Sequence, residues 1–144
     1  MNANEFISTI KSRGATLYAP VDARDIELTN ANLGAQRRAV APAVMREFWT
    51  MAGGANMGSG YIFGPREIDR GTNYPVPSII KVNNDISNIS EIAGKTVFGR
   101  NDLFWFAFDA FGTFYMLDNL ALRVLRKYED GWRAMSDCLM GGRF

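Results

Sequence analysis

Three aspartates, Asp102, Asp109 and Asp118, lie at the ends of short apolar segments in the C-terminal part of the chain. Paired carboxylates can act as general acid and general base. Aspartates at such positions are also common turn formers, because their oxygens accept hydrogen bonds from nearby backbone N–H groups. We therefore expect these aspartates to close turns, and we assign no catalytic residue.

The chain has no histidine and a single cysteine, Cys138. This excludes Ser-His-Asp triads, Cys-His dyads and imidazole bases, and one thiol cannot complete a thiolate zinc site within one chain. Catalysis would have to use carboxylate, lysine or tyrosine side chains, and the sequence shows no assembled acid–base set. We expect a protein that is not an enzyme, without a cofactor or a metal.

The glycine-rich stretch GGANMGSG, residues 53–60, could suggest a phosphate-binding loop. Such a loop feeds the N-terminus of a helix and carries a lysine followed by serine or threonine. Here the glycines follow a helical pattern and contain no lysine. The stretch therefore predicts a helix end and a loop between a helix and a sheet, with Gly53 as a left-handed C-terminal residue.

Composition is that of one folded domain spanning residues 1–144. Apolar residues make up 47%, charged residues 22%, and the net charge is +1. Near neutrality predicts no general attraction to nucleic acid or to an acidic membrane. The N-terminal residues lack the pattern of a secretory signal, no apolar run is long enough to span a bilayer, and a single cysteine fits a reducing compartment. We expect a cytoplasmic protein.

The first half of the chain predicts helices. Phe6, Ile7 and Ile10 share one face of a helix over residues 5–13, with Asn4 as its cap. Residues 16–41 predict mostly loop with short helical pieces. Pro42 suits the first turn of a helix that carries Phe48 and ends near residue 52.

The second half predicts a sheet. Ser78 can cap a helix, and four short aromatic or β-branched segments then follow at meander spacing, over residues 96–100, 103–108, 113–117 and 121–128. The segment 103–108 is apolar on both faces, so it predicts a central strand with Phe106 in the core. A closing helix follows Asp130 and carries Trp132. Together these patterns predict an α+β fold, with an antiparallel meander of about four to six strands packed against helices.

The order of these elements resembles the SUKH superfamily, the group homologous to fungal Smi/Knr cell-wall regulators. APAVMREFWTMAGGANMGSGYIFGPREI is similar to its core motif, a proline-led helix, a paired-glycine loop, a strand and an acidic-apolar pair. The matching positions are Pro42, Phe48, Gly53–Gly54, Tyr61–Phe63 and Glu67–Ile68. GKTVFGRNDLFWFAFDAFGTFYMLD, with Phe106 and Asp109, looks like its second signature. YEDGWRAMSDCLMGG, with Trp132, looks like its final helix. The resemblance covers residues 40–140.

This resemblance implies an α+β fold without enzymatic activity. Bacterial members are mostly inferred to be immunity proteins, which bind and neutralise toxins, often nucleases, delivered between competing cells. Fungal members look like regulatory scaffolds. We therefore expect a cognate toxin protein as partner, with no direct nucleic-acid or membrane binding. The alternatives are a regulatory scaffold or small-ligand-binding module, and a carboxylate-based enzyme. Nuclease inhibitors are often acidic because nuclease grooves are basic, and this chain is nearly neutral.

The sequence also places a candidate partner-binding surface. Residues 54–60 read as a loop, and charged residues follow it. Binding residues concentrate on loops carried by a rigid scaffold, and arginine and aromatic side chains tend to supply the binding energy. We expect the partner to contact a set of six residues: Met57, Tyr61, Arg66, Glu67, Asp69 and Arg70.

Overall fold

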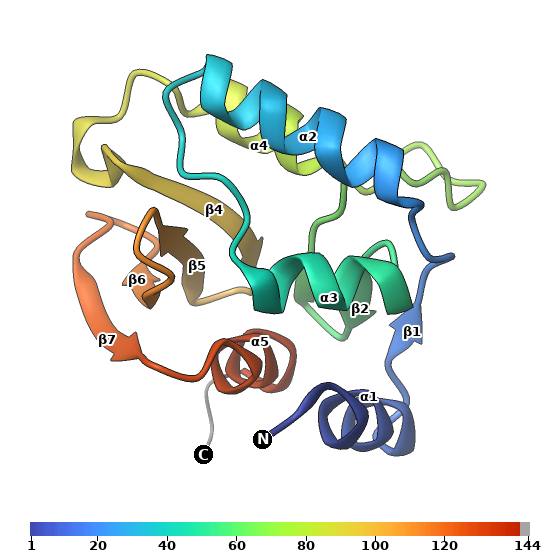
Figure 1. Cartoon of the computed structure of the whole chain (residues 1–144). Helices are drawn as coiled ribbons and strands as arrows, with labels where there is room; N and C mark the ends of the chain where they lie inside the picture. Colours follow the sequence, from blue (N-terminus) through green and yellow to red (C-terminus); the bar gives the residue numbers. More distant parts are fainter. Residues whose placement is uncertain (142–144) are drawn as a thin grey trace.

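A seven-stranded antiparallel sheet forms the centre of the fold (Figure 1). The computed structural model describes residues 1–141, and within them the strands are neighbours in chain order. They are β1 (Thr16–Leu17), β2 (Ala55–Met57), β3 (Gly60–Ile62), β4 (Lys95–Arg100), β5 (Phe104–Asp109), β6 (Phe114–Asp118) and β7 (Val124–Tyr128). The α+β meander is confirmed, but it exceeds four to six strands because the short strands β1 and β2 extend it at one edge.

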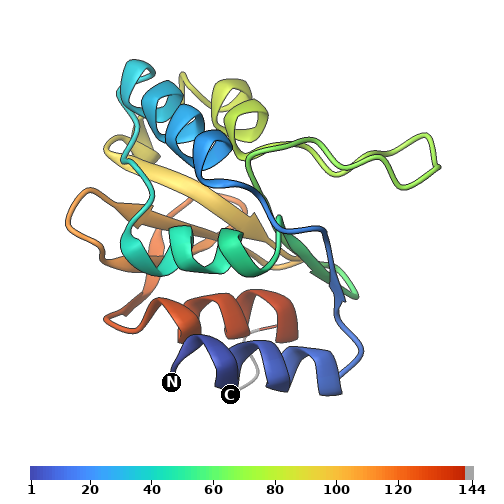
Figure 2. The same ribbon diagram turned by 45° about the vertical axis from the view of Figure 1, so that its right-hand side comes forward.

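Helices lie on both sides of this sheet (Figures 1 and 2). Among residues 1–141 they are α1 (Ala3–Ser12), α2 (Ala23–Ala35), α3 (Ala43–Met51), α4 (Ile79–Asp85) and α5 (Gly131–Met140), with a short 3-10 helix, η1 (Ser90–Ile92). α5 contacts every strand from β2 to β7, and α1 and α3 pack beside it. α4 contacts β4 on the opposite face, with α2 packed against α4. The sheet is thus covered fully on one face and partly on the other.

The fully covered face holds the main core. Phe106 and Phe108 of β5 are completely buried, and Phe98 and Phe114 from the neighbouring strands meet them, with ring centroids 5.4–6.3 Å apart. Trp132 of α5 packs on Phe6 of α1 at 5.4 Å between ring centroids. The predicted central strand, with Phe106 in the core, and the closing helix after Asp130 are therefore confirmed.

The partly covered face has a smaller apolar cluster. It joins α4, η1 and the strands β4 to β6 and consists of Ile86, Ile92, Val97, Ala107, Leu117 and Leu122. Because successive strand residues point to opposite faces, Phe106 and its neighbour Trp105 lie on different sides of β5. Trp105 is only half-buried and packs at the margin of the smaller cluster.

Residues 16–41 were predicted to be mostly loop with short helical pieces, and this underestimated the helix, because α2 occupies thirteen of those residues. Asp22 caps α2 by accepting a hydrogen bond from the Asp25 N–H. The helix buries only Ile26, Thr29 and Leu33. Two apolar residues and a threonine leave a weak helical pattern, which is why the sequence did not reveal α2. A smaller error concerns α1, which is capped by Asn2 rather than Asn4.

The expected loop over residues 54–60 is instead a β-hairpin formed by β2 and β3. Gly53 is not left-handed either, since α3 ends at Met51 and Ala52 is already extended. Glycine is needed at position 53 because the backbone of Ala19 lies against it. A Cβ at this position would collide with the Ala19 carbonyl oxygen. Gly54, with φ +146°, has a backbone conformation that side chains disfavour. Pro42 stands at the N-cap of α3, one residue before the expected first turn.

Arg38 and Asn83 both connect the α4 region to its surroundings. The Asn83 side chain of α4 donates to the Val97 carbonyl of β4 at 2.8 Å and accepts from the Val97 N–H at 2.9 Å. The guanidinium of Arg38 donates to the carbonyl oxygens of Asn83, Ile86, Ile92 and Lys95 at 3.2–3.4 Å. A cation is favourable at the C-terminal end of a helix, where carbonyl groups lack partners. Partial burial of Arg38 lowers its pKa from the ordinary value. Arg38 thus holds the helix that borders the partly covered face.

Candidate functional site

Three strands place Tyr61, Arg100 and Trp105 in one row on the partly covered face. Tyr61 of β3 is the register partner of Arg100 of β4, and Arg100 is the partner of Trp105 of β5. Directly opposite residues of an antiparallel pair have Cβ atoms only about 5 Å apart. The sheet therefore brings two aromatic side chains to either side of an exposed arginine.

The segment between β3 and α4 projects from the body beside this row (Figure 2). Backbone hydrogen bonds of 2.9 Å in both directions join Ile68 and Val76, so the segment folds back on itself. Arg70 connects it to the sheet by donating to the Tyr61 hydroxyl at 2.9 Å and to the Tyr74 carbonyl at 2.8 Å. The Tyr61 bond raises the pKa of Arg70 above its ordinary value. Tyr74 itself is 78% exposed.

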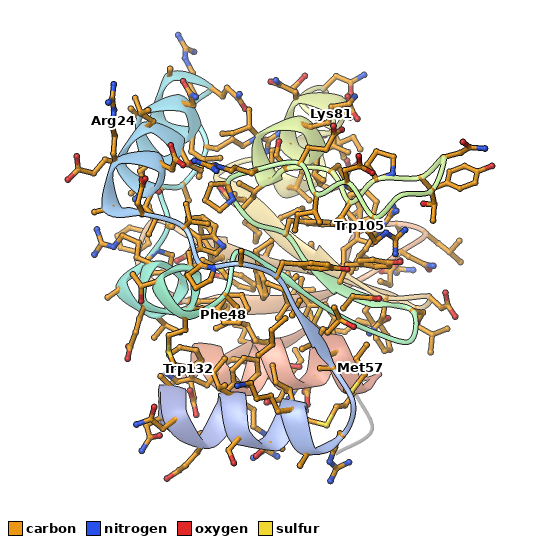
Figure 3. The ribbon with its side chains drawn as sticks, turned by 90° about the vertical axis from the view of Figure 1, so that its right-hand side faces the viewer. Arg24, Phe48, Met57, Lys81, Trp105 and Trp132 are labelled. Atoms are coloured by element: carbon orange, nitrogen blue, oxygen red, sulfur yellow. The ribbon has the colours of Figure 1, made fainter. Side chains whose placement is uncertain are left out.

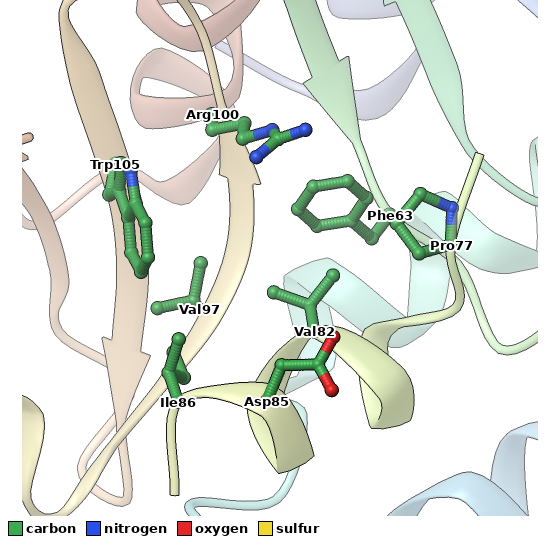
Figure 4. Close-up of a pocket in the computed structure, with 8 residues that line it drawn as sticks. All are labelled: Phe63, Pro77, Val82, Asp85, Ile86, Val97, Arg100 and Trp105. Carbon is green, nitrogen blue, oxygen red and sulfur yellow. The ribbon is translucent and has the colours of Figure 1, made fainter. Parts of the chain in front are cut away.

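A groove runs between the projecting segment, the Tyr61–Arg100–Trp105 row and α4. It consists of two adjoining hollows of about 210 and 330 Å³, which share Phe63, Pro77 and Arg100. Figure 4 shows the smaller hollow with Phe63 and Trp105 on its two sides and Arg100 and Asp85 toward opposite ends. Its apolar floor comes from α4 and β4, through Val82, Ile86 and Val97. Figure 3 shows Trp105 on the side of the projecting segment, away from Phe48 and Trp132.

The groove carries positive charge that the fold does not neutralise. Within residues 1–141, neither Arg70 nor Arg100 has a carboxylate at ion-pair distance. The carboxylate at the other end, Asp85, is paired with Lys81 at 3.0 Å on the same helix. Arginine, tyrosine and tryptophan on a partly apolar surface are suited to binding a partner.

The structure brings together two of the six residues expected to bind a partner, Tyr61 and Arg70, and both line the groove. The other four lie elsewhere. Arg66 pairs with Asp25 of α2, and Glu67 borders a separate hollow beside Tyr18. Asp69 accepts a hydrogen bond from the Gly71 N–H at 2.8 Å, which stabilises the turn of the projecting segment.

Met57 faces a fourth hollow. It is half-buried against the main core, and the hollow is formed with the end of α5 and the β4–β5 turn. The expected set is therefore divided among separate surfaces. Met57 and Tyr61 are separated because side chains of the β2–β3 hairpin alternate between the two faces, and Arg66, Glu67 and Asp69 lie in the segment after β3.

The groove residues that the sequence did not identify are Phe63, Tyr74, Arg100 and Trp105. The sequence did contain a local signal for the pairing of Arg100 with Trp105. The two residues flank the short turn at residues 101–103, which places them opposite each other in a hairpin. The pairing of Tyr61 with Arg100 joins segments far apart in sequence. No local pattern reports such a pairing, so the row as a whole was not predictable.

Two of the three aspartates at the strand ends, Asp109 and Asp118, form turns, as the sequence predicted. Asp109 accepts from the N–H groups of Phe111 and Thr113 at 2.9 and 3.0 Å and from the Tyr115 hydroxyl at 2.6 Å. Desolvation opposes its charge, but these hydrogen bonds outweigh it, so the pKa of Asp109 falls below the ordinary value. Asp118 has a lowered pKa for a similar reason, led by its bond from the Ala121 N–H.

At the turn between β4 and β5, the residue that forms the turn is Asn101 rather than Asp102. The Asn101 side-chain oxygen accepts from the N–H groups of Leu103 and Phe104, both at 2.9 Å. Its amide group donates to the Cys138 carbonyl at 3.1 Å and so connects the turn to α5. Asn101 thus helps to fix the strand ends that carry Arg100 and Trp105.

Residues 1–141 contain no group of three or more cysteine, aspartate or glutamate side chains that could hold a metal ion. Over the same residues, no helix has the length and apolar character needed to cross a bilayer. No protein-family model, curated protein or solved structure matches this chain. The groove is therefore interpreted from its own geometry.

Proposed function

We propose that this chain is a non-catalytic protein-binding module of the SUKH type that acts as a cytoplasmic immunity protein. Its partner would be a toxin, and the chain would neutralise it by stoichiometric binding. The observation that carries the proposal is the Tyr61–Arg100–Trp105 row beside the projecting segment. It supplies aromatic and arginine side chains in a fixed arrangement, with a hydrophobic floor between them.

Preorganisation supports binding at this groove. The sheet fixes Tyr61 and Trp105, and Arg38 fixes the helix at the other side of the groove. Side chains that are already ordered lose less entropy on association, where each newly immobilised side chain costs about 0.5–1.5 kcal/mol. A specific interface covers roughly 800 Å² on each partner, so contacts would extend from the groove onto the projecting segment and Tyr74.

The apolar hollow also favours a second candidate, a small-ligand-binding module. Pockets for small molecules usually enclose about 300–1,000 Å³ and bury most of the ligand. The hollows here, of about 210 and 330 Å³, are at or below the lower end of that range and open to the surface. Because both hollows are open to the surface, they favour side chains of a partner protein over a small molecule that must be mostly buried.

The test begins with capture of partners from the native organism by the tagged wild-type chain. Each captured protein is then expressed in a bacterial host with and without the chain. We expect one of them to arrest growth and the wild-type chain to restore it, whereas Trp105→Ala restores it poorly. Tyr115→Ala is the matched control, because Tyr115 is a half-buried aromatic residue on the same face but outside the groove. Rescue that is equal for wild type and Trp105→Ala would contradict the proposal.

A further inference from the structure

We propose that the partner segment that enters the groove is acidic, with a carboxylate seated between Arg70 and Arg100 and an adjacent apolar side chain between Phe63 and Trp105. This inference rests on the proposed function and specifies the chemistry of the partner. It also opposes the commonest form of the immunity hypothesis. A basic nuclease groove would be repelled by these two arginines.

Arg100 is the first reason. It is exposed, it lines both hollows, and its guanidinium has no ion pair within residues 1–141. Guanidinium groups bind carboxylates in a two-pronged geometry that neutral acceptors do not match. Phe63 and Trp105 on the two sides of the smaller hollow would partly exclude water from that contact and strengthen it.

Arg70 is the second reason. Its contacts with the Tyr61 hydroxyl and the Tyr74 carbonyl use two of the five N–H donors that a guanidinium has. The same contacts and its position 5.5 Å from the centre of the Tyr61 ring hold the side chain at the groove. Arg70 is therefore ordered in advance, with donors left for an incoming acid.

Within residues 1–141, none of the nearby carboxylates forms an ion pair with Arg70 or Arg100. Asp85 is paired with Lys81, Asp69 caps the turn at Gly71, and Glu67 borders the separate hollow near Tyr18. The chain as a whole has a net charge of +1, so attraction to an acidic segment would be local to the groove. Specificity from such local complementarity is common at protein interfaces.

A groove of arginine and aromatic residues could also hold single-stranded nucleic acid. Nucleic-acid affinity grows with the number of phosphates neutralised, and such grooves follow the backbone with many cations. This groove offers Arg70 and Arg100 as its cations. Two cations on a nearly neutral chain favour one or two carboxylates of a peptide over a nucleic-acid strand.

The experiment is selection of a phage-displayed random heptapeptide library on the wild-type chain, on Arg100→Glu and on Arg46→Glu. Arg46 is an exposed arginine of α3 that lies outside the groove, so it matches the charge change. We expect wild type and Arg46→Glu to enrich peptides with an acidic residue next to an apolar one. Arg100→Glu should lose that enrichment, and circular dichroism checks that each variant is folded.

The best peptide and its copy with Asp→Asn or Glu→Gln changes are then titrated by calorimetry. We expect the amide copy to bind at least tenfold more weakly, and Arg70→Gln to weaken the acidic peptide by a similar factor while Arg70→Lys restores part of the binding. An absence of enriched peptides, enrichment of non-acidic ones, amide and acidic peptides of equal affinity, or tighter binding of a ten-nucleotide thymidine strand would overturn the inference.

The captured toxin separates this inference from the proposed function. If Trp105→Ala loses affinity for the toxin while Arg100→Gln and Arg70→Gln retain it, the groove binds the partner but the inference that the bound segment is acidic is wrong. If all three variants bind as wild type does, the groove is not the interface and the inference fails, while binding of the toxin by another surface remains. If the wild-type chain captures no toxin that it neutralises, the proposed function fails. Loss of toxin binding in all three variants supports both the proposed function and the acidic partner segment.

Discussion

The two faces of the sheet differ in what surrounds their aromatic residues. On the face that α1, α3 and α5 cover, Phe98, Phe106 and Phe108 pack against one another within the main apolar core. On the other face, Trp105 lies in a row with Arg100 and Tyr61. Aromatic content alone therefore does not distinguish the two faces. The second face differs by an arginine that has no ion pair within residues 1–141 and lies in register with its aromatic residues.

The largest expected effect concerns Phe106. Phe106→Ala should lower the free energy of unfolding by about 3–5 kcal/mol, as truncation of a buried phenylalanine does. Trp105→Ala, one residue earlier, should lower it by only about 1 kcal/mol because Trp105 is half-buried and leaves little cavity. Urea unfolding of both variants measures the two free energies. Equal losses would show that the two faces are packed alike.

The next effect concerns the anchoring of α4. Arg38→Ala should cost about 2–3 kcal/mol, since hydrogen bonds from a charged group contribute about 1.5–3 kcal/mol each and do not add fully. Arg37→Ala is the matched control, because Arg37 is exposed and substitutions of this kind usually stay within about 0.5 kcal/mol. Chemical unfolding compares the two. A small effect at Arg38 would mean that apolar packing and the Asn83–Val97 hydrogen bonds position α4 without it.

A third prediction concerns the residues first expected to bind a partner. Tyr61→Ala should weaken the complex by more than about 1 kcal/mol, because it removes a groove aromatic and the support of Arg70. Arg66→Ala was expected from the sequence to do the same, but Arg66 pairs with Asp25 outside the groove and should have a smaller effect. Calorimetric titration with the captured partner distinguishes them. A larger loss for Arg66 would place the interface beside Tyr18.

The smallest expected effect is a pH dependence of stability that comes from Asp109, at the end of β5. The pKa of Asp109 is lowered on folding, so the unfolded chain binds more protons at acidic pH. The stability that Asp109 contributes is present above its unfolded pKa of about 3.9 and is lost as pH falls through its folded pKa. Asp109→Asn should therefore narrow the difference in urea midpoint between pH 6 and pH 3. An unchanged difference would show that its hydrogen bonds are not retained in solution.

The sequence predicted the elements whose signals are local. β4 to β7 and α5 have alternating or helical apolar patterns with turn and cap residues, and all appeared close to their expected bounds. β1 and β2 have only two and three residues and leave no pattern, so the number of strands came out too low. α2 was missed because its buried face includes Thr29.

The candidate site was predictable only in part. Tyr61 and Arg70 were identified from residue type and from their place beside a glycine-rich stretch. The other half of the groove depends on the pairing of β3 with β4 and on the packing of α4, which the Arg38 contacts hold in place. These are long-range contacts. They arise from the assembled sheet rather than from neighbouring residues, so Arg100 and Trp105 could not be assigned from the sequence.

The most direct test of the central claim, that the Tyr61–Arg100–Trp105 face is the binding face, is calorimetric titration of the captured partner against Trp105→Ala and Tyr115→Ala. The account predicts at least a tenfold loss of affinity for Trp105→Ala and less than a twofold change for Tyr115→Ala, with circular dichroism confirming that both variants are folded. Unchanged affinity for Trp105→Ala would contradict it and would move the interface elsewhere, first to β7 with Lys127 and to Arg123, the residue before β7.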